Sequence, residues 1–286
     1  MNDIAVIITP SAIIANGIYE GKRRHVSISK NTQSIYEKAI NAYKEGNNEE
    51  ILRIGDIATN IEIHSNGLFF VKNGQVYTQN LQTPAPKILS DRIIKFSKEN
   101  IPVEPLVKFW ENLENNVSEE VQKQLYNFLE HNNIPLTKDG CFIAYKSVSV
   151  GNDGNLWDSY TYNKETGKGT YRNNVGDVVS MPREEVNDDP YQTCSQGLHV
   201  AAFDYAVNHY GTWTSRVGKD QKLVHVKIDP KNVVSVPNDY NGQKMRVCEY
   251  KVVDTSEDRK PIEDQIYEDT DDDLKNEILQ DMYEDK

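Results

Sequence analysis

Nineteen residues, Thr193–Gly211 (TCSQGLHVAAFDYAVNHYG), bring together side chains that could do chemistry. Cys194 and His199 have the residue types of a nucleophile and its general base. With Cys248 or His209, the same two side chains could instead ligate a zinc ion. Their irregular spacing favours a third interpretation, in which they pack as ordinary core residues, and we predict no metal site.

The elements that position these side chains are predicted from the same segment. Gly197 can adopt the positive φ of a tight turn, so we expect a short strand from Leu198 and then a helix over Ala201–Tyr210. Apolar and aromatic residues recur at helical spacing in that helix, which predicts that one face packs against neighbouring strands. The unit is therefore either a well-packed strand–helix element or a pocket with His199 and Tyr210 at its mouth.

An acidic run just upstream has two interpretations. Asn187-Asp188-Asp189-Pro190 has the composition of half a cation-binding loop. Asn and Asp side chains also bond to the backbone two residues further on, which closes an Asx turn. We predict the Asx turn, capping the extended segment that follows.

Composition indicates a folded globular protein. The chain has 286 residues, of which 37% are hydrophobic, and its mean hydropathy is −0.67. This length predicts two domains of ordinary size. The three cysteines are sparse and lack a CxxC spacing, which is typical of reduced thiols in a cytosolic compartment. No apolar run approaches the roughly 18 residues of a membrane span, and we expect no signal peptide.

The net charge of −12 is concentrated at one end of the chain. Residues 255–286 contain thirteen Asp or Glu against four Lys or Arg, a net charge of −9, so the preceding 254 residues carry only −3. Such a balanced body has no electrostatic footprint for duplex nucleic acid. Nucleic-acid binding is therefore not expected.

The order of predicted elements indicates an α+β protein in four parts. Residues 1–82 predict an N-terminal α+β region with β-hairpins, in which Ile61–His64 is a strand and Asn73-Gly74 a hairpin turn. Residues 83–133 predict a helical segment with helices at Pro86–Glu99, Val103–Leu113 and Ser118–Phe128, the last with Ser118 as its N-cap. Residues 134–254 predict a β-rich mixed domain. That domain contains a buried strand at Cys141–Val148 and a closing strand at Arg246–Val253.

Residues 255–286 predict an acidic tail that ends in a short amphipathic helix. Its narrow apolar stripe would dock on the chain itself or on a partner. The candidate partner-binding residues are Leu274, Ile278, Leu279 and Met282.

Four stretches of sequence carry a family resemblance. They are DGCFIAYK at Asp139–Lys146, MPREEVNDDPYQTCSQGLHV at Met181–Val200, HYGTWTSRV at His209–Val217 and VKIDPKNVVSVPNDYNGQKMRVCEYKVV at Val226–Val253. They closely resemble the rIIB proteins of tailed phages, also called protectors from prophage-induced early lysis or rIIB lysis-inhibition proteins. The resemblance extends less densely back to about His25, and the start of the chain lacks the helix-turn-helix-like segment of some members.

The resemblance implies a phage early accessory protein that acts by protein–protein association. Its implied partner is a larger rIIA-like phage protein, and a host or prophage defence protein is a further candidate partner. The implied setting is the host cytoplasm, with peripheral association at the inner membrane through the partner. The implied role is lysis inhibition and protection of the infection against prophage-encoded exclusion. On this interpretation the protein is not an enzyme.

A second resemblance implies a different class of function. Gly197–Ala202 with the aromatic helix that follows is similar to the central segment of ADP-ribosyltransferase folds. Carried over by position, Tyr210 would stack on nicotinamide and Glu249 would be the catalytic carboxylate. His199 is a further candidate for catalysis and for nucleotide binding. The upstream strand offers Tyr145 and Lys146 where that family has a histidine. The alternative function is thus a nucleotide-binding sensor or enzyme, for which NAD or ADP-ribose would be the ligand.

Overall fold

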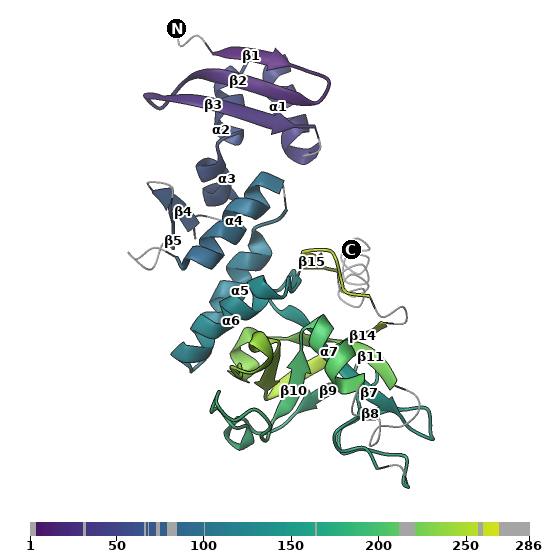
Figure 1. Cartoon of the computed structure of the whole chain (residues 1–286). Helices are drawn as coiled ribbons and strands as arrows, with labels where there is room; N and C mark the ends of the chain where they lie inside the picture. Colours follow the sequence, from purple (N-terminus) through teal and green to yellow (C-terminus); the bar gives the residue numbers. More distant parts are fainter. Residues whose placement is uncertain are drawn as a thin grey trace, which may run out of the picture. The chain divides into compact units, whose positions relative to one another are not determined.

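The computed structural model describes residues 4–30, 33–65, 67, 69–72, 75–78, 85–99, 101–163, 165–211, 221–256 and 260–268. It divides into two compact units, Met1–Val107 and Lys108–Lys286 (Figure 1). Both helices and strands occur in each unit, and a large mixed sheet dominates the second. The predicted α+β class is confirmed, while the finer division into four parts stays a prediction.

Unit 1 begins with a three-stranded antiparallel sheet. Its strands are β1 (Ala5–Ile8), β2 (Ala12–Tyr19) and β3 (Lys22–Ser29), in that spatial order. Helices α1 (Gln33–Lys44) and α2 (Asn48–Ile54) cover one face. The alternation of each strand sends one set of side chains to that covered face, where they form the first core. The fully or almost fully buried members are Ile13, Ala15, Val26, Ile28, Ala39, Ala42, Ile51, Leu52 and Ile54.

The rest of unit 1 corrects one prediction. Ile61–His64, predicted as a strand, belongs to the helix α3 (Ile57–His64). Asp56 explains the difference, because its Oδ2 accepts hydrogen bonds from the backbone N–H and the hydroxyl of Thr59, at 3.1 and 2.8 Å, and so caps the helix start. The hairpin predicted around Asn73-Gly74 is confirmed, because β4 (Phe69–Lys72) pairs antiparallel with β5 (Gln75–Thr78). The helix α4 (Lys87–Glu99) follows this hairpin.

Two amphipathic helices precede the main sheet. They are α5 (Glu104–Glu114), which crosses the division between the units, and α6 (Glu119–His131). Phe109 of α5 contacts Phe142 of the sheet edge-to-face, with ring centroids 6.5 Å apart. The predicted cap at Ser118 is confirmed, since its Oγ accepts the N–H of Val121 at 3.3 Å.

The main sheet of unit 2 runs in the order β12-β13-β10-β7-β11-β14-β9. Its centre is β7 (Phe142–Val150), in which every residue but the last is buried, as predicted for the CFIAYKSV run. Helix α7 (Phe203–Gly211) packs on the face of β7 and β10 that carries Tyr145. The remaining strands are β6 (Leu136–Thr137), β8 (Leu156–Asp158), β9 (Val178–Ser180), β10 (Leu198–Ala201), β11 (Gln221–Ile228), β12 (Val233–Ser235), β13 (Lys244–Val247), β14 (Glu249–Ser256) and β15 (Ile266–Tyr267).

The closing strand predicted at Arg246–Val253 is wrong as a single element. The chain breaks at Cys248 into β13, which pairs with β10, and β14, which pairs with β11 and β9. The backbone N–H of Cys248 donates to the carbonyl of Asn232 at 2.9 Å and therefore takes no part in either ladder. One apolar run thus supplies two strands in different places of the sheet.

Asn116 ties the helical hairpin to the sheet. It is 3% exposed, and its side-chain amide donates to the carbonyls of Pro230 and Val233, each at 2.8 Å. Its own Oδ1 accepts the N–H of Ser118 at 3.0 Å. These bonds fix the α5–α6 turn against the segment that leads into β12.

We expect Asn116→Ala to destabilise unit 2 by about 2–3 kcal/mol, because it removes the hydrogen bonds to the carbonyls of Pro230 and Val233 and the one from the N–H of Ser118, each worth about 1 kcal/mol. Urea unfolding followed by tryptophan fluorescence measures this change, since the three tryptophans all lie in Lys108–Lys286. The exposed neighbour Asn115 is the control, and Asn115→Ala should change the free energy of unfolding by less than about 0.5 kcal/mol. Equal effects of the two substitutions would contradict this role.

Candidate functional site

The segment between Asn187 and Gln196 forms a closed loop on unit 2. The backbone N–H of Asn187 donates to the carbonyl of Gln196 at 2.9 Å, which closes its base. The predicted Asx turn is present, since the Asn187 Oδ1 accepts the N–H of Asp189 at 2.8 Å. A second such turn follows, in which Asp189 Oδ1 accepts the N–H of Tyr191 at 2.9 Å. We call this segment the Asn187–Gln196 loop.

A buried arginine from β13 holds this loop from beneath. Arg246 is 0% exposed, and its guanidinium donates to the carbonyls of Asn187, Asp189 and Gln192 at 2.7, 2.6 and 2.5 Å. It also donates to the hydroxyl of Ser235 at 2.9 Å. Hydrogen bonds from a charged donor are about twice as strong as neutral ones, and a buried charge requires them. These hydrogen bonds therefore stabilise the loop in the conformation that the structure shows.

Lys244, two residues earlier on β13, extends the same arrangement. Its ammonium group donates to the carbonyl of Thr193 at 2.6 Å and pairs with the carboxylate of Asp239 at 2.8 Å. It also lies 5.9 Å from the ring centroid of Tyr205 in α7. Four carbonyls of residues 187–193 thus receive hydrogen bonds from two buried cations of one strand.

Gly197 lets the returning chain pass close to Arg246. It has a φ of +149°, as the predicted tight turn requires. A Cβ at this position would lie 2.9 Å from Val186 Cγ1 and 3.2 Å from Arg246 Cβ. Any larger residue would push the loop away from the arginine that holds it.

The outer side of the loop faces solvent. Tyr191 at its tip is 81% exposed, and Cys194 is exposed as well. Cys248, by contrast, is buried, and its Sγ donates to the carbonyl of Asn232 at 3.4 Å. No group of three or more His, Cys, Asp or Glu side chains that could hold a metal ion occurs in the described ranges.

Two of the sequence-predicted site residues lie together inside the fold. Lys146 is buried, pairs with Asp158 at 2.8 Å and donates to the backbone carbonyl of His199 at 2.9 Å. Burial alone would raise the pKa of Asp158, but the charge and hydrogen bond of Lys146 hold it below its usual value. The Lys146 ammonium also lies 5.9 Å from the ring centroid of Tyr250. The contacts of Lys146 are therefore with groups of the fold itself.

The imidazole of His199 is surrounded by positive charge. Partial burial, together with the charges of Lys146, Arg246 and Lys244, lowers its pKa to about 4. The ring is therefore neutral at physiological pH. Its place opposite Arg246 in the β10–β13 ladder fixes its position beside the anchored loop.

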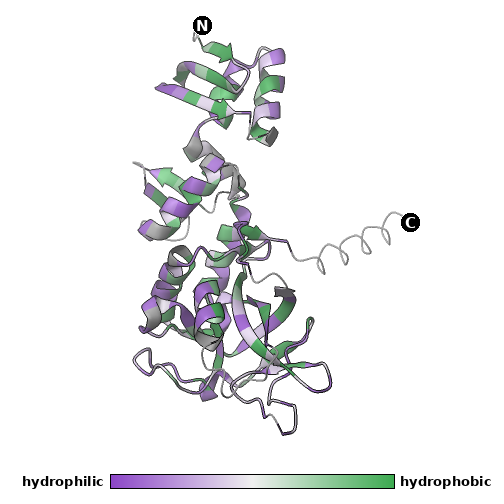
Figure 2. Cartoon of the chain, turned by 45° about the vertical axis from the view of Figure 1, so that its right-hand side comes forward, coloured by the Kyte–Doolittle hydropathy of each residue, from purple (hydrophilic) through white to green (hydrophobic). Residues whose placement is uncertain are grey.

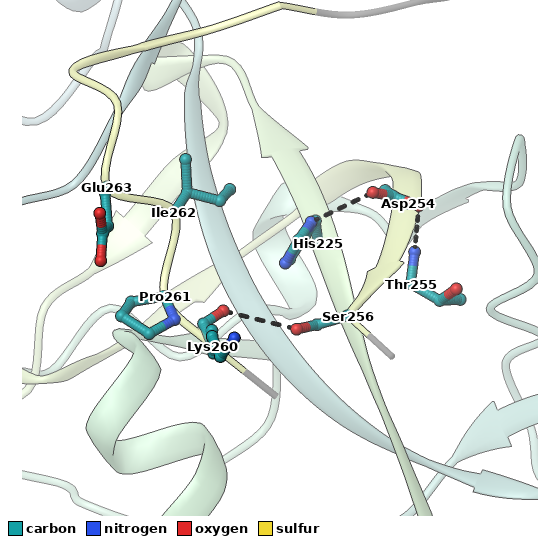
Figure 3. Close-up of a pocket in the computed structure, with 8 residues that line it drawn as sticks. All are labelled: His225, Asp254, Thr255, Ser256, Lys260, Pro261, Ile262 and Glu263. Carbon is teal, nitrogen blue, oxygen red and sulfur yellow. Dashed lines mark hydrogen bonds and ion pairs between the residues drawn. The ribbon is translucent and has the colours of Figure 1, made fainter. Parts of the chain in front are cut away.

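Tyr145 lies on the opposite face of β7 from Lys146 and contacts a different part of the chain. Its hydroxyl accepts a hydrogen bond from the N–H of Ile262 at 2.8 Å. Its ring packs edge-to-face against that of His225, with ring centroids 5.2 Å apart. A pocket of about 530 Å³ adjoins this contact (Figure 3). The close-up shows its lining residues, which are His225, Asp254, Thr255, Ser256, Lys260, Pro261, Ile262 and Glu263.

Glu249 lies away from these groups. The strand register aligns Tyr145 with His225 and His225 with Asp254. Glu249 comes five residues before Asp254 on β14, a separation of roughly 16 Å along the strand. It is exposed, and its Oε1 accepts a hydrogen bond from the side chain of Asn232 at 3.2 Å. Glu249 and Tyr145 therefore do not share one site.

The other predicted site residues fall outside the described part of the structure. Tyr210 belongs to α7, but its side chain is among the parts left undescribed, and so are all four apolar residues of the tail. The nucleotide-site and tail hypotheses stay predictions. The tail residues are Leu274, Ile278, Leu279 and Met282.

Sequence reasoning missed Tyr191, Lys244 and Arg246. A signal for the two cations exists in the sequence, because Lys244 and Arg246 alternate with Met245 and Val247 in a strand that is otherwise apolar. Alternation places both cations on one face of that strand. Two cations on one face of a buried strand must find acceptors elsewhere in the chain.

The site consists of a loop held by two buried cations, with an exposed tyrosine at its tip. The comparisons with known proteins give the chain a family. The sequence model of the family described as Bacteriophage T4 protein rIIB matches residues 26–285. The chain belongs to this family. It is 34% identical over 266 residues to Protein rIIB of Enterobacteria phage T4, a match that covers 88% of this chain and 79% of that protein. No solved structure matches this chain.

The anchored loop joins two of the stretches that carry the family resemblance. The loop belongs to the Met181–Val200 stretch, and the cations that hold it belong to the Val226–Val253 stretch. Within the described ranges, no helix has both the length and the apolar character needed to cross a bilayer. The resemblance to ADP-ribosyltransferases has no support from the comparisons.

The neutral state of His199 predicts a pH dependence of stability. In the unfolded chain a histidine has a pKa of about 6.5, so between pH 6.5 and 4 the unfolded state binds a proton that the native state does not. The free energy of unfolding therefore falls as pH is lowered through this window, by roughly 2 kcal/mol after allowance for solvent screening. Urea unfolding of unit 2 at pH 7 and pH 4.5, followed by tryptophan fluorescence, measures the loss.

His199→Gln should remove that part of the pH dependence. The exposed His25 provides the matched control, and His25→Gln should keep the wild-type difference between the two pH values. A wild-type pH dependence in His199→Gln would contradict the assigned state of the ring.

Proposed function

We propose that this protein is an rIIB-type phage accessory protein that acts by association with an rIIA-like phage protein. In this role it contributes to lysis inhibition and to protection of the infection against prophage-encoded exclusion. A host or prophage defence protein is a further partner class. The protein works in the host cytoplasm and reaches the inner membrane through its partner. Family membership supports the class of protein, and the surface of unit 2 supports association as its mode of action.

The observation that carries the proposal is the exposed tip of the Asn187–Gln196 loop. Aromatic side chains are enriched among the residues that dominate binding energy, and Tyr191 is 81% exposed. Ordering a flexible loop costs affinity, but here Arg246 and Lys244 already hold the backbone. A fixed loop with an aromatic tip is suited to insertion into a pocket of another protein.

The contacts that the charged groups make also favour association over catalysis as the function. Lys146 and Lys244 pair with carboxylates, and Arg246 donates to backbone carbonyls. A catalytic site needs groups held against a substrate rather than against the fold. The cations around His199 act as structural anchors on this account.

Tyr191→Ala should weaken binding to an rIIA-like partner at least about tenfold, a loss of about 1.4 kcal/mol, because it removes the aromatic anchor. Its thermal stability should stay close to that of the wild type, since the side chain is exposed. Titration of the purified partner by calorimetry measures the affinity.

Tyr160→Ala is the matched control, because Tyr160 is 86% exposed on the same unit but lies outside the loop. It should bind like the wild type. Wild-type affinity in Tyr191→Ala would remove the loop from the proposal, and absence of any complex with an rIIA-like protein would contradict the proposed partner.

A further inference from the structure

The sheet of unit 1 has two unlike edges. The edge strand β3 carries Lys22, Arg23 and Arg24 at its start, and charges on an edge oppose pairing with another chain. The other edge strand, β1, contains only Ala, Val and Ile (Figures 1 and 2). Ile7 and Ile8 are 57% and 41% exposed. Within the described part of unit 1, this edge strand therefore carries no charge that would oppose pairing.

The hairpin fixes which backbone groups of β1 point outward. The N–H of Thr9 donates to the carbonyl of Ala12 at 2.8 Å, so these two residues form a hydrogen-bonded pair. Such pairs alternate along an antiparallel ladder, and Ile7 with Ile14 is the next one. The N–H and C=O groups of Val6 and Ile8 are consequently directed away from β2.

We propose that β1 is a dimerisation edge, on which a second copy of this chain pairs antiparallel to form a continuous six-stranded sheet. In this arrangement Val6 pairs with the partner's Ile8, and the outward N–H and C=O groups of each bond to those of the other. Ile7 then meets the partner's Ile7 on the two-fold axis. The two side chains are Cβ neighbours about 4.5–5.5 Å apart on the same face.

The apolar, uncharged composition of β1 favours a second copy of this chain as its partner. A two-fold interface requires a surface that is complementary to itself, which an uncharged apolar strand satisfies and the basic edge at β3 does not. Pairing also covers Ile7 and extends the uncovered face of the sheet, where Ile14 lies directly opposite Ile7. Three residues of each chain pair, which is a small interface, so the dimer is weak and reversible.

This surface is separate from the proposed partner site. It lies in unit 1, and β1 and β2 precede the residues that match the family model, which begin at residue 26. Dimerisation through β1 can therefore be tested without the phage partner. Its failure would leave the Tyr191 surface untouched.

Sedimentation equilibrium of the full chain over about 1–200 μM tests the proposal. The wild type should show a monomer–dimer equilibrium, and Ile7→Lys should shift its dissociation constant at least about tenfold, because it places two like charges directly opposite each other. Ile18→Lys is the matched control, since Ile18 is 47% exposed on the same face but belongs to β2. It should dimerise like the wild type.

Two further variants separate pairing from misfolding. Ile8→Pro removes one outward N–H and leaves the hairpin ladder intact, so it should be a folded monomer. Mixing Ile7→Lys with Ile7→Glu should restore a dimer that neither forms alone, because opposite charges then meet on the axis. A monomeric wild type at 200 μM, or an unchanged dimer in Ile7→Lys, would overturn the proposal.

Discussion

The structure of unit 2 depends on one buried guanidinium. Arg246 is fully enclosed, and an enclosed charge must have its donors satisfied or be strongly destabilising. Three of its acceptors are backbone carbonyls of the Asn187–Gln196 loop. The loop cannot move away without leaving the charge unsatisfied, and the arginine cannot be replaced without freeing the loop. Two stretches of the chain more than fifty residues apart are thereby coupled.

The same constraint determines the surroundings of the loop. Gly197 is needed where the chain passes the arginine, and burial together with the cations near His199 lowers its pKa and keeps the ring neutral. Lys146 joins the carboxylate of Asp158 to the backbone of β10, so the centre of the sheet is held by a buried ion pair. Each charged group at this place is used to position backbone. The outer side of the loop, with the exposed Tyr191, stays accessible, and this supports our proposal that the protein acts by binding another protein.

Local signals in the sequence predicted much of the fold, and long-range contacts account for the rest. The helices α4 to α6 were predicted within a few residues because apolar spacing and the cap at Ser118 are local features. The strand at Ile61–His64 was wrong because the capping carboxylate of Asp56 precedes the segment it controls. The prediction of a single strand at Arg246–Val253 was wrong because sequence periodicity does not show where the chain changes its partner strand. For the site, the Asx turn was predictable from Asn187 itself, whereas the carbonyls that receive Arg246 lie 54 to 59 residues away along the chain.

The central claim is that Arg246 supports partner binding by fixing the position of Tyr191. A double-mutant cycle on the affinity for an rIIA-like partner tests this claim most directly. Tyr191→Ala is measured in the wild type and in Arg246→Lys, which keeps a positive charge but lacks the planar fork whose three nitrogens reach the three carbonyls. The account predicts that Tyr191→Ala weakens binding at least about tenfold in the wild type and less than about threefold in the Arg246→Lys background. Equal losses in the two backgrounds would contradict it.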